Sequence, residues 1–462
     1  MTTEPSDRSK AQVGGAWPGR PPGVPGGVPP PSVPLSFLAA ASFGLVACGI
    51  TFIWARGAGI PDPTTDPIVV ATHFGVLATL SMGVLGAMHQ FTPVITGRPL
   101  RSIRLARATF LFWLAASWML PIGIATEQVA VTAISGAFAA LAIALLVVNF
   151  TGALSVRGKG APVTGLRFAL AGSVLTGCLG AAFVGDRQGN WFHLVGHVDL
   201  TMGVIGLFGW LGVTYVAVAE KLWPMFFLAH VPGRHLAGRM AVWAVPTGVA
   251  LLSAGLIFNV SGIAWGGAFL LAAGLGAHLV SLVAHVRHRR RKADLHLAFV
   301  VTSALWLLAG IGLSLASALV MPHDYVFGVA LVAAALVAFG GWLLTALVGH
   351  AHKVVPFIVW SALRGRGVDK NPAGKPLLFA DLYDHRWAAV TYGLVTAGVT
   401  GLCVGFAASL PAATAAGGAA LVATGIVVAV NLSVIPTGMH SKSAVARASR
   451  GESVIGEKLE SA

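Results

Sequence analysis

The sequence predicts an all-α integral membrane protein with about twelve transmembrane helices. Three observations predict it. The 462 residues are 56% hydrophobic and 10% charged, whereas a soluble domain carries about 25% charged residues. Apolar runs of about 20 residues, the length of a helix that crosses a bilayer, recur along the chain. The basic residues fall in the short segments between these runs.

The chain divides into a central membrane domain and two tails. The apolar runs lie at 35–56, 68–92, 106–126, 128–151, 163–185, 193–220, 238–258, 262–286, 296–319, 325–350, 387–409 and 413–435. No water satisfies backbone polar groups inside lipid, so runs of this length form helices. We therefore expect a membrane domain over 35–437, a disordered Pro/Gly-rich tail over 1–34 and a C-terminal tail over 438–462.

The basic residues predict the orientation of these helices. Lys and Arg gather in cytoplasmic loops beside the membrane. When the runs are placed alternately up and down, all 30 Lys and Arg except Arg56 and Arg187 fall on one side. We expect a multi-pass protein of the plasma (inner) membrane with both tails cytoplasmic. Its predicted partner is the lipid bilayer, and the net charge of +14 gives no reason to expect nucleic acid.

An internal repeat predicts the architecture. Polar residues followed by a proline close the second, sixth and tenth runs, at Pro93, Pro224 and Pro356. The spacing is 131 residues (224 − 93) and then 132 residues (356 − 224). A fixed period indicates repeated structural units. We expect three pseudo-repeats of four helices, a plan unlike that of transporters made of two six-helix halves.

Three stretches carry a resemblance to a known family. They are THFGVLATLSMGVLGAMHQFTPVITGRPL (72–100), GHVDLTMGVIGLFGWLGVTYVAVAEKLWPMF (196–226) and GHAHKVVPFIVW (349–360). With twelve helices in three units, the chain resembles the catalytic subunit of the heme–copper oxidases, which include cytochrome c oxidase subunit I and nitric oxide reductases. The resemblance covers about 35–435 and suggests a divergent member.

The resemblance implies particular ligand positions. The family has a low-spin heme ligand near the outer end of its second helix, where this chain has His73. It has a copper-ligand histidine on its sixth helix, where this chain has His193 and His197. These two histidines are four residues apart and so share one face of a helix.

The chain departs from the family pattern at the other ligands. The family has two adjacent copper-ligand histidines on helix 7, but 238–258 contains no histidine. It has two heme-ligand histidines within helix 10, but 325–349 contains none and only His323 lies just before it. We therefore expect heme and/or copper, without a complete heme–copper centre. The expected role is electron transfer or gas or metal handling, with a separate redox partner or oxidase-type subunits.

The first candidate site, which we call the outer site, lies at the non-cytoplasmic ends of the predicted helices. Its proposed ligands are His73, His193, His197 and His323. Neutral imidazole binds heme iron and copper, and Asp199 can orient a ligand histidine. The alternative is that His193 and His323 are interfacial and bind nothing, while His197 and Asp199 form a hydrogen-bonded core pair.

The second candidate site is an inner ring of residues at equivalent repeat positions. It contains His89, Glu220 and His352, with His350 two residues before the last. Two histidines and a carboxylate can coordinate a divalent metal or relay protons. The alternative is a capping or snorkelling role at helix ends. His278, deep in 262–286, is either a ligand or a satisfied core residue, and we favour the second interpretation.

Two other classes of function fit the same pattern. One is a transporter or channel in which His89, Glu220 and His352 line a cytoplasmic gate. The other is a non-catalytic assembly partner. The sequence contains no phosphate loop and no nucleophile elbow, so soluble-enzyme chemistry of those kinds is not expected.

Overall fold

The computed structural model confirms an all-helical membrane fold. It describes residues 27–55, 65–157, 160–189, 198–231, 236–365, 367–371 and 374–437. Twelve helical spans in this part of the chain are long and apolar enough to cross a membrane. The first helix begins at Ser32 rather than at Leu35. Most of the predicted N-terminal tail and all of 438–462 lie outside the described residues.

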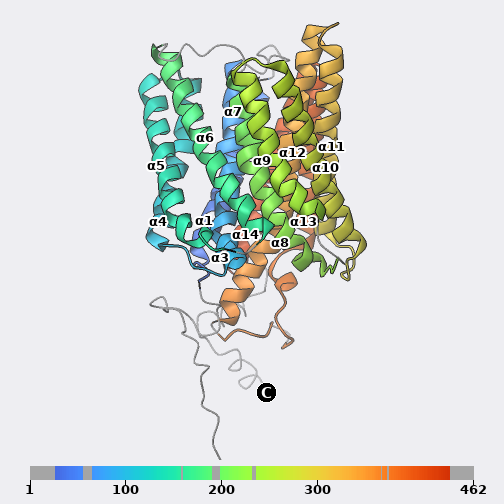
Figure 1. Ribbon diagram of the computed structural model, residues 1–462. Coiled ribbons are helices and arrows are strands. Elements are labelled where there is room, and N and C mark those ends of the chain that lie inside the picture. The colour runs from blue at the N-terminus through green and yellow to red at the C-terminus, as the bar shows by residue number, and fades with distance from the viewer. Residues whose placement is uncertain are drawn as a thin grey trace, which may run out of the picture.

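The helices run along the bundle (Figure 1). They are α1 (Ser32–Ala55), α2 (Asp66–His73), η1 (Phe74–Ser81), α3 (Met82–Thr96), α4 (Ile103–Ala125), α5 (Val129–Leu154), α6 (Ala161–Gly189), α7 (Val198–Val204), η2 (Ile205–Gly212), α8 (Val213–Phe227), α9 (Leu236–Ile257), α10 (Ser261–Arg287), α11 (Leu295–Val320), α12 (Tyr325–Arg364), η3 (Phe379–Leu382), α13 (His385–Ala407) and α14 (Pro411–Thr437). α12 has 40 residues and continues well past the predicted end of its apolar run.

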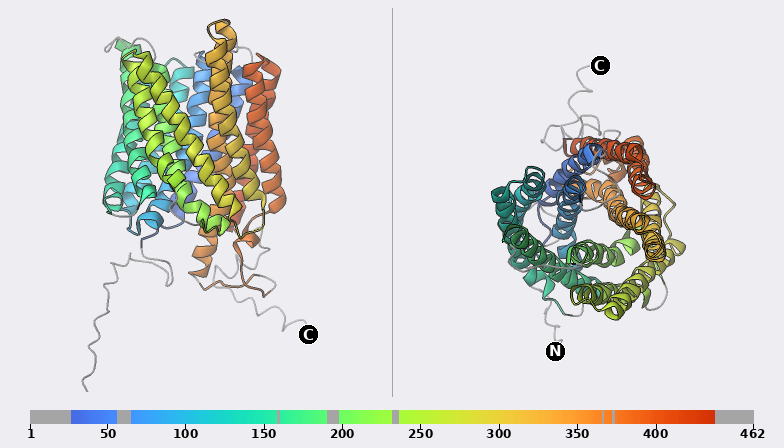
Figure 2. Two further views of the ribbon diagram at one scale, coloured as in Figure 1. Left: turned by 45° about the vertical axis from the view of Figure 1, so that its right-hand side comes forward. Right: turned by 90° about the horizontal axis from the view of Figure 1, so that it is seen from above.

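Three spans form the centre of the bundle. They are α2–η1–α3, α7–η2–α8 and α12, and they contact one another through η1, η2 and α12. The other helices surround them, as the view from above shows (Figure 2). Neighbouring outer helices pack in pairs, α4 with α5, α9 with α10 and α13 with α14. The buried side chains of His89, His350, His352 and Lys353 all lie on these central spans.

Two central spans contain a π-helical turn at matching positions. η1 begins at Phe74 and η2 at Ile205, 131 residues later, and both have eight residues. The Trp210 indole N–H on η2 donates to the Ser81 hydroxyl on η1 over 3.2 Å. π-turns inside α-helices are frequent at functional sites. These bounds agree with the predicted period in the first two units, and the complete threefold repeat stays a prediction.

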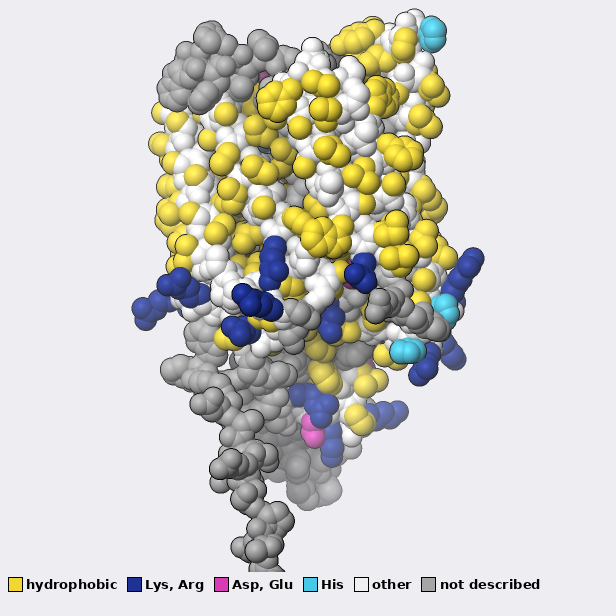
Figure 3. Space-filling view, viewed as in Figure 1, with side chains coloured by type: hydrophobic (Ala, Val, Ile, Leu, Met, Phe, Trp, Pro, Cys, Tyr) yellow, Lys and Arg dark blue, Asp and Glu magenta, His cyan; other side chains and the backbone are white. Residues whose placement is uncertain are grey.

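One end of the bundle carries the basic side chains. We define the basic end as the end at which α3, α8 and α12 finish and α4, α9 and α13 begin. On the face shown in Figure 3, Lys and Arg lie along and below this end, and hydrophobic side chains cover the band above it. Large apolar residues such as Phe269 on α10 and Leu305 on α11 are exposed. This surface fits contact with a lipid bilayer, and the cytoplasmic placement of the basic end stays a prediction from the distribution of Lys and Arg.

Close helix contacts depend on glycine. Gly417 on α14 faces α13, where an added Cβ would lie 2.7 Å from the backbone nitrogen of Leu402 and 2.8 Å from the Gly398 carbonyl oxygen. Small residues let membrane helices approach this closely. A larger side chain must push the two backbones apart, since neither contact is to a flexible side chain.

We predict that Gly417→Leu lowers the melting temperature of the detergent-solubilised protein, by overpacking that costs about 1–3 kcal/mol. Gly393→Leu on α13 is the matched control, because Gly393 is exposed and an added Cβ there meets nothing within 4 Å. Thermal unfolding followed by circular dichroism measures both variants. Equal melting temperatures would contradict the α13–α14 packing.

Candidate functional site

The predicted outer site is described only in part. His73 is the last residue of α2 and is partly buried. Its Nδ1 lies 2.7 Å from the Val69 carbonyl oxygen. His323 lies in the turn between α11 and α12 with an exposed side chain. His193 and His197 lie outside the described residues, so a shared ligand set at this end stays a prediction.

The three inner-ring residues lie in three separate environments. His89 is fully buried, stacked on Phe37 with ring centres 5.0 Å apart and edge-on to Phe150 at the same distance. Glu220 accepts a hydrogen bond of 2.8 Å from the Ser281 hydroxyl on α10. Each residue thus contacts a different set of neighbouring helices.

His352 completes this arrangement on α12. Its ring stacks on Phe299 of α11, with ring centres 5.9 Å apart, and lies 6.3 Å from the ring of Tyr383. Tyr383 lies before α13, outside the spans, and burial raises the pKa of its phenol, with a further increase from Asp294. The phenol therefore stays protonated. Within the described residues, no group of three His, Cys, Asp or Glu side chains converges as a metal site.

A second group of histidines lies between α8, α10, α11 and α12. We call it the histidine cluster: His278, His296 and His350, with the aromatic residues Tyr215, Trp223 and Phe226. The rings of His296 and His350 are 5.0 Å apart. The Tyr215 ring lies 5.5 Å from His278 and 5.8 Å from His350. The structure thus brings His350 together with His296, which the sequence analysis did not single out.

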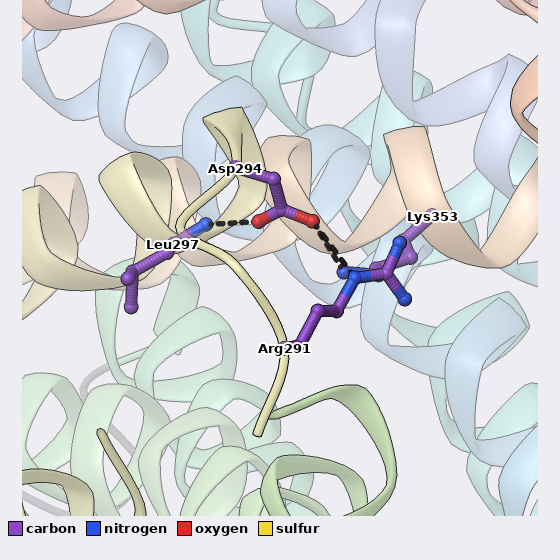
Figure 4. Close-up of polar contacts among 4 residues, drawn as sticks. All are labelled: Arg291, Asp294, Leu297 and Lys353. Carbon is purple, nitrogen blue, oxygen red and sulfur yellow. Dashed lines mark hydrogen bonds and ion pairs between the residues drawn. The ribbon is translucent and has the colours of Figure 1, made fainter. Parts of the chain in front are cut away.

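Arg291, Asp294 and Lys353 form an ion-pair network (Figure 4). The Asp294 carboxylate lies 3.0 Å from the Lys353 ammonium and 3.4 Å from Arg291 Nε. Its other oxygen accepts the backbone N–H of Leu297 and caps α11. The Lys353 ammonium also lies 5.5 Å from the ring centre of Phe226. Lys353, interpreted from the sequence only as part of the basic side, is therefore a buried partner of α11.

The hydrogen bonds of the histidines define their neutral tautomer. Nδ1 of His73, His89, His350 and His352 lies 2.7–2.8 Å from the carbonyl oxygen four residues earlier. A carbonyl only accepts, so in the neutral ring Nδ1 carries the proton and Nε2 carries a lone pair. This is the tautomer of a metal-ligating histidine whose other nitrogen is held by the backbone.

Several of these ring nitrogens are buried without a hydrogen-bond partner. They are Nε2 of His89, His350 and His352, Nδ1 of His278 and both nitrogens of His296. His278 is a core residue, as predicted, but one nitrogen is not satisfied. A buried polar atom without a partner is costly. The lone pairs among these nitrogens are thus not used by protein side chains.

No known protein family matches this chain, and no curated protein matches it.

Proposed function

We propose that this integral membrane protein is heme–copper-oxidase-like and binds a redox metal through histidines, for electron transfer or for gas or metal handling. The twelve apolar spans of the described residues fit an integral membrane protein. The proposed metal binding is supported by the resemblance of the stretches 72–100, 196–226 and 349–360 to the heme–copper oxidases. These stretches form much of the three central spans.

One observation carries the proposal. The central spans hold several histidines whose Nδ1–H is held by a backbone carbonyl and whose Nε2 is left with a lone pair. Imidazole in this form suits copper, iron and zinc. A bound heme or copper would supply one-electron redox chemistry that no protein side chain supplies.

Copper is the simpler occupant to propose, because a single ion held by imidazoles needs no large cavity. We therefore propose His73 as a copper ligand, with His193 and His197 as its predicted partners.

A complete heme–copper centre is not part of the proposal. α9 contains no histidine, and the histidines of α12, His350 and His352, both lie toward the basic end. The ligands that the family uses to reduce oxygen or nitric oxide therefore have no counterparts there. The proposed chemistry is binding and electron transfer at a metal.

We predict that His73→Ala removes at least half of the copper that co-purifies with the full chain in mild detergent. The matched control is His288→Ala, because His288 is exposed at the end of α10 and its Nδ1 makes the same kind of backbone hydrogen bond. Copper and iron per protein are measured by elemental analysis. Unchanged copper in a folded His73→Ala protein would contradict the assignment.

Transport is the second candidate function. Glu220 is a carboxylate within a span, held by Ser281 beside Gly238. Ionisable groups inside a membrane often mark ion or substrate pathways. A folded preparation free of metal and heme, with substrate movement that Glu220→Gln abolishes, would favour this function over the first.

A further inference from the structure

We propose that residues 287–292, which we call the basic segment, bind the head group of an anionic phospholipid whose acyl chain lies along α10. Every residue of this segment is Arg or Lys except His288. Clusters of basic residues directly beside a transmembrane helix are typical of binding to anionic lipid head groups. This site goes beyond the proposed function, because neither the metal nor any of its proposed ligands takes part in it.

Most of the positive charge of the basic segment is not neutralised by the protein. The carboxylate of Asp294 is already paired with Arg291 and Lys353. Three further basic side chains are exposed and have no acidic partner within the described residues: Arg287, Arg290 and Lys292. In Figure 3, Lys, Arg and His side chains gather below the part of the bundle where Figure 1 shows α10 and α11. This charge favours an anionic ligand.

The backbone of the basic segment is anchored to α8. The Phe227 carbonyl oxygen accepts the backbone N–H groups of Arg290, over 3.2 Å, and of Arg291, over 3.3 Å. Phe227 is the last residue of α8, and the last carbonyls of a helix have no partner within that helix. These bonds hold the basic segment against the bundle before a ligand binds, so less conformational entropy is lost on binding.

An exposed apolar face of α10 leads to the basic segment. Val280, Val283 and Arg287 follow one another at intervals of three and four residues, so they share one face of the helix. Val280 is 60% exposed and Val283 is 46% exposed. The helix rises about 10 Å from Val280 to Arg287, which is less than half of the roughly 30 Å hydrocarbon core. A lipid whose phosphate contacts Arg287 therefore has its acyl chain beside the two valines, within one leaflet.

The combination of charge and apolar surface favours a phospholipid over a soluble anion. A free phosphate ion would contact only the basic segment, whereas a phospholipid also covers Val280 and Val283. Arg287 suits the boundary between them, because an Arg side chain packs its aliphatic stem on apolar surface and keeps its charged end in the interface. Tight binding therefore needs both a negative head group and an acyl chain.

The test counts the lipids that bind to the full chain in mild detergent by native mass spectrometry. The protein is titrated with phosphatidylglycerol and with phosphatidylcholine of the same acyl chains. We expect phosphatidylglycerol to bind more tightly, and expect Arg287→Gln/Arg290→Gln to weaken its binding about tenfold. The matched control is Arg101→Gln/Arg104→Gln, which removes the same charge from exposed residues beside the start of α4 and should leave this binding unchanged.

The outcomes separate a lipid site from weaker alternatives. Equal binding of the two lipids, or equal weakening by both pairs of substitutions, would overturn the site and indicate only a general attraction to the basic end. Displacement of phosphatidylglycerol by an equal concentration of inorganic phosphate would also overturn it, in favour of a soluble anion. If the Arg287→Gln/Arg290→Gln protein does not fold, a photoreactive phosphatidylglycerol decides on the unchanged protein. Crosslinks are then expected within 280–292, and crosslinks only elsewhere would contradict the proposal.

Discussion

Asp294→Asn is expected to destabilise the protein by about 3 kcal/mol, because it leaves the Lys353 ammonium buried without its counter-charge. The Lys353 side chain is 9% exposed and that of Asp294 is 34% exposed. Because Asp294 is partly solvated, we expect a loss of stability at the lower end of the range for buried ion pairs that lose one partner. Asn still caps a helix well, so the cap at Leu297 is kept and the charge alone is lost. Thermal unfolding in detergent measures the change.

The double variant Asp294→Asn/Lys353→Met separates charge burial from other effects. Replacing both members of a buried pair by groups without charge is often neutral. We therefore expect the double variant to recover most of the lost stability. If it is as unstable as Asp294→Asn alone, the destabilisation does not come from the unpaired ammonium, and the ion pair is not what holds α11 to α12.

Trp342→Ala is expected to have a similar or larger effect, about 3–5 kcal/mol, by leaving a cavity at the centre of the bundle. Trp342 is 1% exposed, and its ring centre lies 5.6 Å from that of Tyr215 and 6.2 Å from that of His278. Lipid tails are as apolar as a protein core, so the loss comes mainly from dispersion contacts. Thermal unfolding and the yield of monodisperse protein report it.

Trp265→Ala is the matched control for this cavity. Trp265 lies on α10 and is 65% exposed on the outer surface. Its removal takes away contact with lipid or detergent and leaves no internal cavity. We expect a melting temperature within about one degree of the unchanged protein, given that surface substitutions alter stability by less than about 0.5 kcal/mol. A large drop in melting temperature with Trp265→Ala would contradict the placement of Trp265 on the outer surface.

The helices could be predicted from the sequence because membrane spans follow from composition alone. All twelve apolar runs correspond to spans, and most bounds agree within a few residues. The extension of α12 to Arg364 was not predicted, because Lys353 and Pro356 were interpreted as the end of the apolar run. The π-turns at η1 and η2 were missed as well, because an apolar run has the same composition in either helical form.

The candidate site was less predictable because it depends on contacts between distant segments. His296 was not singled out, although it begins an apolar run, because its only special property is its distance of 5.0 Å from His350. His89, Glu220 and His352 share a predicted repeat position, but such a position does not say which neighbours each side chain contacts. The structure supplies those neighbours: Phe37 and Phe150 for His89, and Ser281 for Glu220.

The central claim is that buried histidines with a free lone pair hold a redox metal inside this bundle. The most direct measurement is the copper and iron content of the unchanged full chain, purified in mild detergent from copper-supplied cells, with absorption spectra of the oxidised and reduced protein. The account predicts stoichiometric copper in the chain and no Soret band. A folded protein with neither copper nor iron would contradict it, and a Soret band with stoichiometric iron would replace copper by heme as the bound group.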